Sequence, residues 1–190
     1  MKGYSVFKAY TFIELMVVIT IISFLSVMTY IPYSFYQNKE KLRSGAKEIS
    51  QSISDARNLA INGLSNSSSN VSVGIYFDKL KKNKIDYFSY PYNYYGPIKV
   101  EENLSENIKL IKTRQLDENI WINSIYSKDN FLIIYDSITG NAKYFYKENT
   151  DFIPLSLTGI IDINIGLKGV KEGILSKTIK YNPKTYITDY

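Results

Sequence analysis

The most constraining feature of this chain is a long uncharged, apolar segment near its start. No charged side chain occurs between positions 15 and 38, and positions 12–31 are almost entirely apolar. A helix that crosses a bilayer needs ~20 mostly apolar residues. A secretory signal peptide has a shorter apolar region of ~7–15 residues followed by small residues at a cleavage site, and that pattern is missing here. A core helix of a soluble protein would carry charges along such a length. The segment is therefore predicted to be a membrane-inserted helix.

A single carboxylate, Glu14, lies near the N-terminal end of this apolar segment. A charge beside a hydrophobic span is costly in lipid and usually has a purpose. One explanation is local, because Thr11 and Glu14 have the S/T-x-x-E spacing of a capping box, and a carboxylate in a first helical turn complements the helix dipole. The other explanation is functional, and the two can coexist.

The helical pattern continues beyond the apolar segment, with a kink allowed at Pro32. Gly63 and the Ser/Asn-rich positions 65–70 then indicate its end. The sequence thus predicts one helix from Thr11 to Ile61, apolar all round in its first half and carrying one apolar stripe in its second. That stripe, which we call the helix seam, has spacings of 4, 3, 4, 3 and 4 and consists of Leu42, Ala46, Ile49, Ile53, Ala56 and Ala60.

After position 70 the apolar pattern changes to the period of two that is typical of strands. In the first such run, Val71, Val73, Ile75 and Phe77 share one face, and the 18 tyrosines of the chain favour strands generally. Successive strands with short turns and no helix between them predict an antiparallel sheet. The fold class is therefore predicted to be α+β, with one long N-terminal helix packed by its second half on one mostly antiparallel β-sheet. The predicted strands lie in 71–77, 85–90, 107–116, 119–125, 130–136, 142–147, 159–167 and 174–182.

The N-terminal residues resemble a known family. The stretch AYTFIELMVVITIISFLSVMTYIP, preceded by a short basic leader, is similar to the N-terminal signal of type IV pilins and type II secretion pseudopilins. Positions 46–61, followed by a short loop and VSVGIYFD, more loosely resemble the minor pilin and minor pseudopilin group. Ala9 stands where the family usually has glycine, and the closing Gly-Arg turn of the minor group is absent.

This resemblance implies a processing site and an assembly site. Cleavage after Ala9 would make Tyr10 the new N-terminus and a candidate for N-methylation. Glu14 then lies four residues beyond the new terminus, and it is implied, with Thr11, to act in assembly by pairing with the N-terminal amine of a neighbouring subunit. The expected organisation is a cleaved leader at 1–9, a transmembrane and assembly half of the helix at 10–37, an amphipathic half at 38–64, and a β-rich globular domain at 65–190.

The expected partners follow from the same resemblance: prepilin peptidase, other pilin or pseudopilin subunits, and membrane lipid. The expected function is a structural subunit, minor pilin or pseudopilin, of a type IV pilus, a type II secretion-like filament or a DNA-uptake filament. The expected location is the inner membrane, spanned once, with the C-terminal domain outside the cytoplasm. Basic residues flank the span on both sides, so the charge pattern does not set this orientation. The alternative is a single-pass, membrane-anchored β-domain that acts as a surface binding module, with Glu14 only a cap.

A lysine-rich turn suggests a second, speculative contact surface. Tyrosine and phenylalanine side chains follow it between positions 87 and 95, and lysines with aromatic side chains can bind single-stranded nucleic acid. The favoured interpretation is a solvated hairpin turn beside strands whose rings pack half inward. The net charge is +5, or +3 once the leader with Lys2 and Lys8 is removed, which is a weak field for a nucleic-acid receptor. The lysines of this turn are Lys79, Lys81, Lys82 and Lys84.

The composition argues against most enzyme chemistry. The chain has no cysteine and no histidine, which excludes disulfides, thiol catalysis, imidazole catalysis and Cys/His zinc sites. The acidic pairs at 101–102 and 117–118 lack the spacing of a calcium loop and are expected to be solvated turn residues. Nucleophile-elbow, P-loop and dinucleotide fingerprints are missing. We therefore expect no enzymatic activity, no cofactor and no metal.

Overall fold

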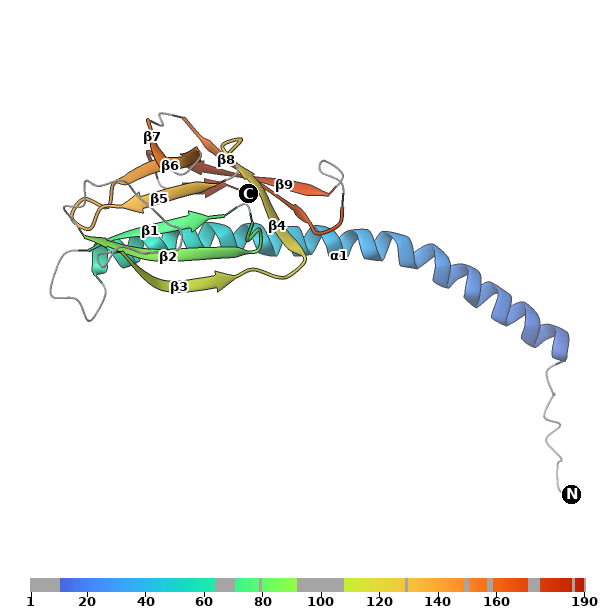
Figure 1. The fold of residues 1–190 in the computed structure, drawn as a ribbon. Helices are drawn as coiled ribbons and strands as arrows, with labels where there is room; N and C mark the ends of the chain where they lie inside the picture. Colours follow the sequence, from blue (N-terminus) through green and yellow to red (C-terminus); the bar gives the residue numbers. More distant parts are fainter. Residues whose placement is uncertain are drawn as a thin grey trace, which may run out of the picture. The chain divides into compact units, whose positions relative to one another are not determined.

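One helix, α1 (Phe12–Asn62), precedes all the strands in the computed structural model (Figure 1). Its ends agree to within one residue with the helix predicted from Thr11 to Ile61, and Pro32 lies inside it. Gly63 follows with a φ of 73°, the left-handed conformation that commonly ends a helix and that glycine adopts without a Cβ penalty. The structure describes residues 11–63, 71–78, 80–91, 108–128, 130–148, 151–156, 159–170, 175–185 and 187–189.

The chain divides into two compact units at the boundary between Lys39 and Glu40. The first unit contains the apolar half of α1. The second contains the amphipathic half of α1 and all of the strands. The boundary lies two residues from the one expected between positions 37 and 38.

Within the part of the second unit that the structure describes, ten strands form two sheets, where a single sheet was expected. The six-stranded sheet has the order β3-β2-β1-β5-β6-β7, and the four-stranded sheet has the order β10-β9-β8-β4. Every pairing is antiparallel, as predicted. The strands are β1 (Val71–Phe77), β2 (Lys84–Pro91), β3 (Lys109–Gln115), β4 (Ile120–Ile125), β5 (Phe131–Tyr135), β6 (Ala142–Glu148), β7 (Asp151–Leu155), β8 (Ile161–Leu167), β9 (Ser176–Asn182) and β10 (Ile187–Asp189).

A tight turn carries the chain from the four-stranded sheet to the six-stranded sheet. The amide of Lys128 donates to the carbonyl of Ile125 at 2.8 Å, and the reverse bond measures 3.1 Å. The two residues between them, Tyr126 and Ser127, have φ values of 51° and 57°. Positive φ at both central positions defines a turn that non-glycine residues rarely occupy. Because neither residue is glycine, asparagine or aspartate, no turn was predicted at this connection.

The helix seam is the centre of the main core, as predicted. Its six side chains are 0% to 4% exposed and pack with apolar side chains from both sheets. Figure 1 shows the strands lying along this half of α1. On β1, Val73, Ile75 and Phe77 face the same core, which confirms that they share a face. The seam is thus the surface on which both sheets pack.

A second apolar cluster, which sequence analysis did not predict, lies apart from the main core. Tyr76 contacts Phe152 edge-on with ring centroids 5.7 Å apart and lies 6.5 Å from Phe88. These aromatic residues come from β1, β7 and β2, so β1 is buried on both faces. The remaining buried members are Tyr90, Ile108 and Leu132.

Two strands, β7 and β10, were not predicted, and the reason lies in their own sequences. β7 contains Pro154, which cannot donate a backbone hydrogen bond and therefore argues against a strand in sequence. It is accommodated because β7 forms one edge of the six-stranded sheet. β10 spans three residues, too few to show an alternating pattern.

The first prediction concerns the helix seam. Ile49→Ala and Ile53→Ala should each lower the free energy of unfolding by roughly 2–5 kcal/mol, because each leaves a cavity in the core that α1 shares with both sheets. Urea denaturation of a soluble fragment starting at Tyr36 measures this. Gln51→Ala, on the exposed side of the same helix, is the control and should change stability little. Losses below about half a kilocalorie at both isoleucines would contradict the assigned packing.

Candidate assembly segment and polar contacts

The start of α1 is a capping box. The backbone amide of Thr11 donates to Oε2 of Glu14 at 2.8 Å, and the Thr11 hydroxyl donates to the same oxygen at 2.9 Å. In return, the Glu14 amide donates to the Thr11 hydroxyl oxygen at 3.4 Å. These bonds form the reciprocal pattern of the motif. The predicted capping box therefore accounts for the contacts that Glu14 makes within the single chain. Among the described residues no donor reaches Oε1, the other carboxylate oxygen.

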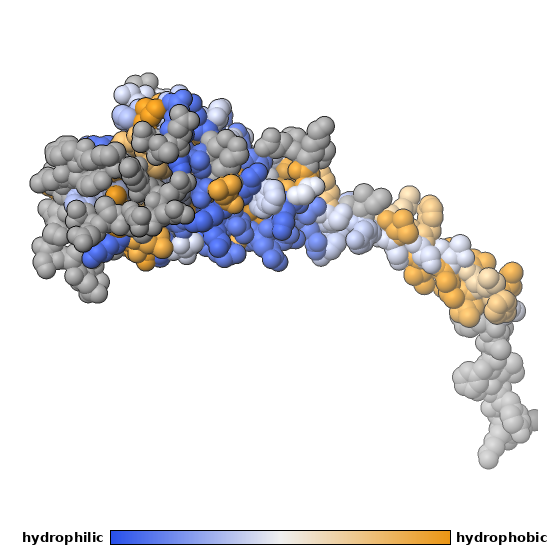
Figure 2. Space-filling model, viewed as in Figure 1, coloured by the Kyte–Doolittle hydropathy of each residue, from blue (hydrophilic) through white to orange (hydrophobic). Residues whose placement is uncertain are grey.

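The apolar half of α1 is exposed around its whole circumference. Large apolar side chains from Phe12 to Tyr36 are half to three-quarters exposed, and Figure 2 shows the hydrophobic surface that they form on this unit. Among the described residues, α1 is the one helix long and apolar enough to cross a membrane. A soluble protein rarely leaves so large an apolar surface in water.

Three hydroxyl groups in this segment are hydrogen-bonded within the helix. Thr20 donates to the carbonyl of Met16 at 2.8 Å, and Ser26 donates to the carbonyl of Ile22 at 2.8 Å. Thr29 bonds its own preceding turn in the same way. Because a bilayer core offers no water to unpaired polar groups, such internal bonds allow hydroxyls to sit in an apolar surrounding.

The comparisons with known proteins agree with these features. Residues 5–30 match the family described as the prokaryotic N-terminal methylation motif. The chain carries a type IV pilin and pseudopilin signal. No curated protein matches the chain, and no solved structure does. The signal supports a pilin-like or pseudopilin subunit and implies processing by prepilin peptidase and assembly with other pilin subunits. Together with the apolar helix, it fits a single-pass inner-membrane anchor.

The predicted processing residues, Ala9 and Tyr10, lie outside the described residues. Both therefore remain predictions. The match to residues 5–30 contains them, but it does not identify the bond that is cut.

Two lysines of the lysine-rich turn contact groups within the chain. Nζ of Lys81 lies 3.7 Å from a carboxylate oxygen of Asp86. Nζ of Lys82 lies 4.9 Å from the centre of the Trp121 ring. Lys84 begins β2 and is half-buried, and Lys79 lies outside the described residues. Of the aromatic side chains that follow, Tyr87, Phe88 and Tyr90 are buried, so a nucleic-acid surface here remains a prediction without added support.

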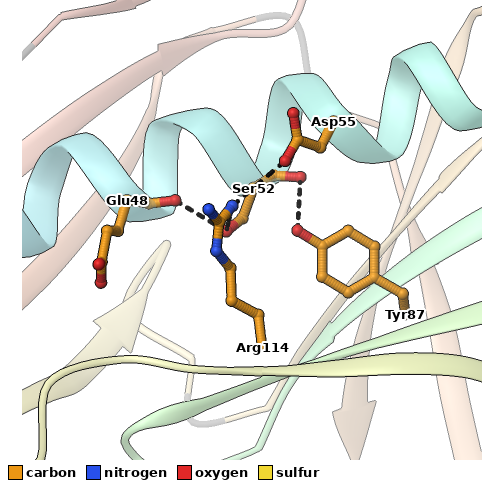
Figure 3. Close-up of polar contacts among 5 residues, drawn as sticks. All are labelled: Glu48, Ser52, Asp55, Tyr87 and Arg114. Carbon is orange, nitrogen blue, oxygen red and sulfur yellow. Dashed lines mark hydrogen bonds and ion pairs between the residues drawn. The ribbon is translucent and has the colours of Figure 1, made fainter.

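A polar cluster connects α1 to the six-stranded sheet (Figure 3). One guanidinium nitrogen of Arg114, on β3, lies 3.2 Å from the Asp55 carboxylate and 3.1 Å from the Ser52 hydroxyl oxygen. Tyr87, on β2, donates its hydroxyl proton to the Ser52 carbonyl at 3.2 Å. The Ser52 hydroxyl donates to the carbonyl of Glu48 at 2.7 Å. The Ser52 hydroxyl proton is therefore used in a hydrogen bond to the helix backbone. Through the other contacts, the cluster links the helix to β2 and β3.

Burial and bonding act in opposite directions on the Tyr87 phenol. Desolvation raises its pKa above the usual value, and the contacts with Ser52 and Arg114 offset only part of that rise. Lys112 adds a cation 4.6 Å from the centre of the ring. The neutral phenol is therefore the form that the folded chain favours.

The second prediction follows from this pKa shift. A group whose pKa is raised in the folded state contributes stability below its unfolded pKa, about 10 for tyrosine, and loses it as the pH rises through the folded pKa. The stability of wild type should therefore fall more steeply above pH ~10 than that of Tyr87→Phe. Urea denaturation between pH ~8 and ~11 measures the difference. Tyr36→Phe, at an exposed ring, should follow wild type, and parallel profiles for all three proteins would contradict the assignment.

Proposed function

We propose that this chain is a minor subunit of an extracytoplasmic filament of the type IV pilus, type II secretion or DNA-uptake class. The observation that carries the proposal is the combination of the N-terminal methylation motif with an apolar half-helix that is exposed on all sides. Such a surface needs lipid before assembly and other helices after it. The assignment as a minor subunit rests on the similarity of positions 46–61 and 71–78 to that group.

In this proposal the leader, residues 1–9, is removed after Ala9, and Tyr10 becomes the N-terminus. The span then holds the chain in the inner membrane, with the β-rich domain outside the cytoplasm. Tyr30, Tyr33 and Tyr36 are each more than 60% exposed near the end of the apolar segment. Tyrosine is enriched where a span meets the membrane–water interface, which supports a span that ends there.

Glu14 would have two roles in this setting. Its Oε2 accepts both bonds from Thr11, and this leaves Oε1 to pair with the N-terminal amine of a neighbouring subunit. An unpaired carboxylate in an apolar surrounding is costly, so pairing favours the one axial position in which the amine and the carboxylate meet.

The capping box favours a second candidate function. Because Thr11 alone satisfies one carboxylate oxygen, Glu14 could be only a helix cap on a single-pass anchor. The β-rich domain would then act as a surface binding module that does not assemble.

The third prediction separates the two functions at the cleavage site. Mass spectrometry of the protein purified from its native membrane should find Tyr10 as the first residue, with an added methyl group. Ala9→Leu should block cleavage, because a protease that reaches the backbone needs a small side chain there, and the full chain should then stay in the membrane unassembled. Lys8→Leu is a bulk-matched control one residue earlier and should still be cut. An intact Met1 in wild type, or normal cleavage of Ala9→Leu, would contradict the assigned site.

The fourth prediction concerns Glu14 and is measured by co-purification of tagged and untagged copies from membranes. Glu14→Ala should abolish or strongly reduce association while leaving the stability of the β-rich domain unchanged, because Glu14 lies in the other unit. Glu14→Asp keeps the charge but shortens the reach, so it should also be impaired.

Two further variants separate pairing from capping. Glu14→Gln keeps an acceptor for Thr11 but loses the charge, and it should fail to associate. Thr11→Val removes the hydroxyl but keeps the charge; it should cost the first turn about a kilocalorie per mole and retain association. If Glu14→Gln associates normally and Thr11→Val does not, the results would favour the second candidate function, a membrane-anchored binding module.

A further inference from the structure

The turn between β1 and β2 presents an apolar side chain to solvent among lysines. Leu80 is 88% exposed, the highest value among the large apolar side chains of the described residues. Its amide donates to a carboxylate oxygen of Asp78 at 2.8 Å, and the amide of Lys81 donates to the Asp78 carbonyl at 3.1 Å. These bonds hold the turn in the conformation that exposes Leu80. A single exposed leucine is common on soluble proteins, so the surroundings of Leu80 decide what it means.

The single tryptophan of the chain lies beside the same turn. Nζ of Lys82 is 4.9 Å from the centre of the Trp121 ring, and the amide of Ile122 donates to the Lys82 carbonyl at 2.8 Å. Trp121 is half-buried, so part of its ring reaches the surface. Tryptophan is enriched where proteins meet the membrane–water interface, and lysine there lays its apolar stem along the hydrocarbon while its charge stays in water.

The next turn and α1 hold the β1–β2 turn in place. The amide of Leu116 donates to the Asn83 carbonyl at 2.9 Å. A Cβ placed at Gly45 of α1 would lie 2.9 Å from a methyl carbon of Ile120, so the start of β4 packs directly on the helix there. Positions 78–83 and 116–122 thus form one structure, which we call the β1–β2 corner. Gly45 follows Tyr36 by nine residues, a length of about 32 Å even when fully extended, so the corner is tethered close to any bilayer that the apolar segment spans.

The charges around the β1–β2 corner are mixed, and that mixture suits phospholipid headgroups. Lys81 lies 3.7 Å from the Asp86 carboxylate, yet its side chain is 56% exposed. Asp117 accepts the backbone and side-chain amides of Asn119, which lowers its pKa and keeps it ionised, and Glu118 beside it is exposed. A bilayer surface offers phosphates to the lysines and, in zwitterionic lipids, ammonium groups to the carboxylates. Single-stranded nucleic acid offers phosphates alone, which the carboxylates would repel.

We propose that Leu80 and Trp121 enter the interfacial region of the bilayer that anchors the chain, with Lys81 and Lys82 at the level of the lipid phosphates. The partner is therefore a phospholipid surface. All four residues belong to the second unit, so the β-rich domain has its own contact with the membrane besides its covalent link through α1. The proposal rests on the membrane anchor, which belongs to both candidate functions, and does not need assembly.

The test measures the fluorescence of Trp121, the single tryptophan, in the full chain incorporated into vesicles of phosphatidylethanolamine and phosphatidylglycerol in equal parts. Lipids that carry a nitroxide on the headgroup should quench this fluorescence strongly, and lipids that carry it at the end of the acyl chain should quench it much less. Flotation of the vesicles checks the anchor separately. A chain that floats with the vesicles but is not quenched overturns the lipid contact and leaves the anchor intact, whereas a chain that does not float overturns both.

Two matched variants locate the contact. Leu80→Glu replaces an exposed apolar side chain with a negative one, so it should leave the fold intact and lose most of the quenching by headgroup-labelled lipid. Ile138→Glu makes the same change at a side chain that is 57% exposed in the turn between β5 and β6. In that turn a Cβ placed at Gly140 would lie 2.8 Å from Ile61, near the other end of α1. Ile138→Glu should therefore be quenched as wild type is. Equal quenching of wild type and Leu80→Glu would overturn the assigned contact.

A titration with an oligothymidylate separates lipid from nucleic acid at the β1–β2 corner. Bases that stack near an aromatic side chain should quench Trp121 without any labelled lipid. Saturable quenching by the oligonucleotide, with none by headgroup-labelled lipid, would assign the corner to nucleic acid and overturn the proposal. Quenching by headgroup-labelled lipid with no response to the oligonucleotide supports it.

Discussion

The packing of the helix seam is the constraint on which the rest of the second unit depends. Burial of apolar surface is the main favourable term in folding, and here both sheets obtain it from one stripe of α1. Three of the six seam residues are alanines that are 0% to 1% exposed. Their small side chains allow close packing against the helix, and Ile49 and Ile53, which lie between them along the seam, are buried in the same core. Each sheet would expose an apolar face without this stripe.

The same helix has two different surfaces because its sequence changes where charges begin. Between positions 15 and 38 no residue is charged, and the large apolar side chains there are exposed on all sides. From Lys39 onward, charged residues occupy positions between the seam residues. The boundary between the two units follows Lys39. A helix with one apolar stripe is stable against a sheet in water, whereas one that is apolar all round needs lipid or other helices. The difference between the two halves of the helix therefore follows from the sequence pattern.

Features that depend on local sequence pattern could be predicted, whereas those that depend on pairing between distant segments could not. The helix, its seam and eight strands follow from periodicity, and the Thr11–Glu14 capping box follows from spacing. The division into two sheets depends on which strands pair, and the turn at Tyr126 and Ser127 has no sequence signal. The contacts of Lys81 with Asp86 and of Lys82 with Trp121 were not predicted, because they depend on how the folded chain places these side chains beside the turn. A cavity lined by Arg57 of α1, Tyr135 and Tyr181 brings together three segments that are far apart in the sequence, so no local pattern could predict it.

The capping box changes what pairing of Glu14 would achieve. In the single chain, Thr11 already supplies two donors to one carboxylate oxygen, so the cost of placing Glu14 in an apolar surrounding is partly offset before any neighbour arrives. An amine from a second subunit would then add a partner for the second carboxylate oxygen only, because the first oxygen already accepts two hydrogen bonds from Thr11. Such a pair contributes little net affinity, because the amine must also lose its hydration, but removal of Glu14 would leave that amine unpaired in an apolar surrounding and would strongly weaken association. The pair also depends strongly on position, since a shift of one helical turn, about 5.4 Å, separates the two charges. The apolar surface would therefore supply the attraction between subunits, and Glu14 would select the register.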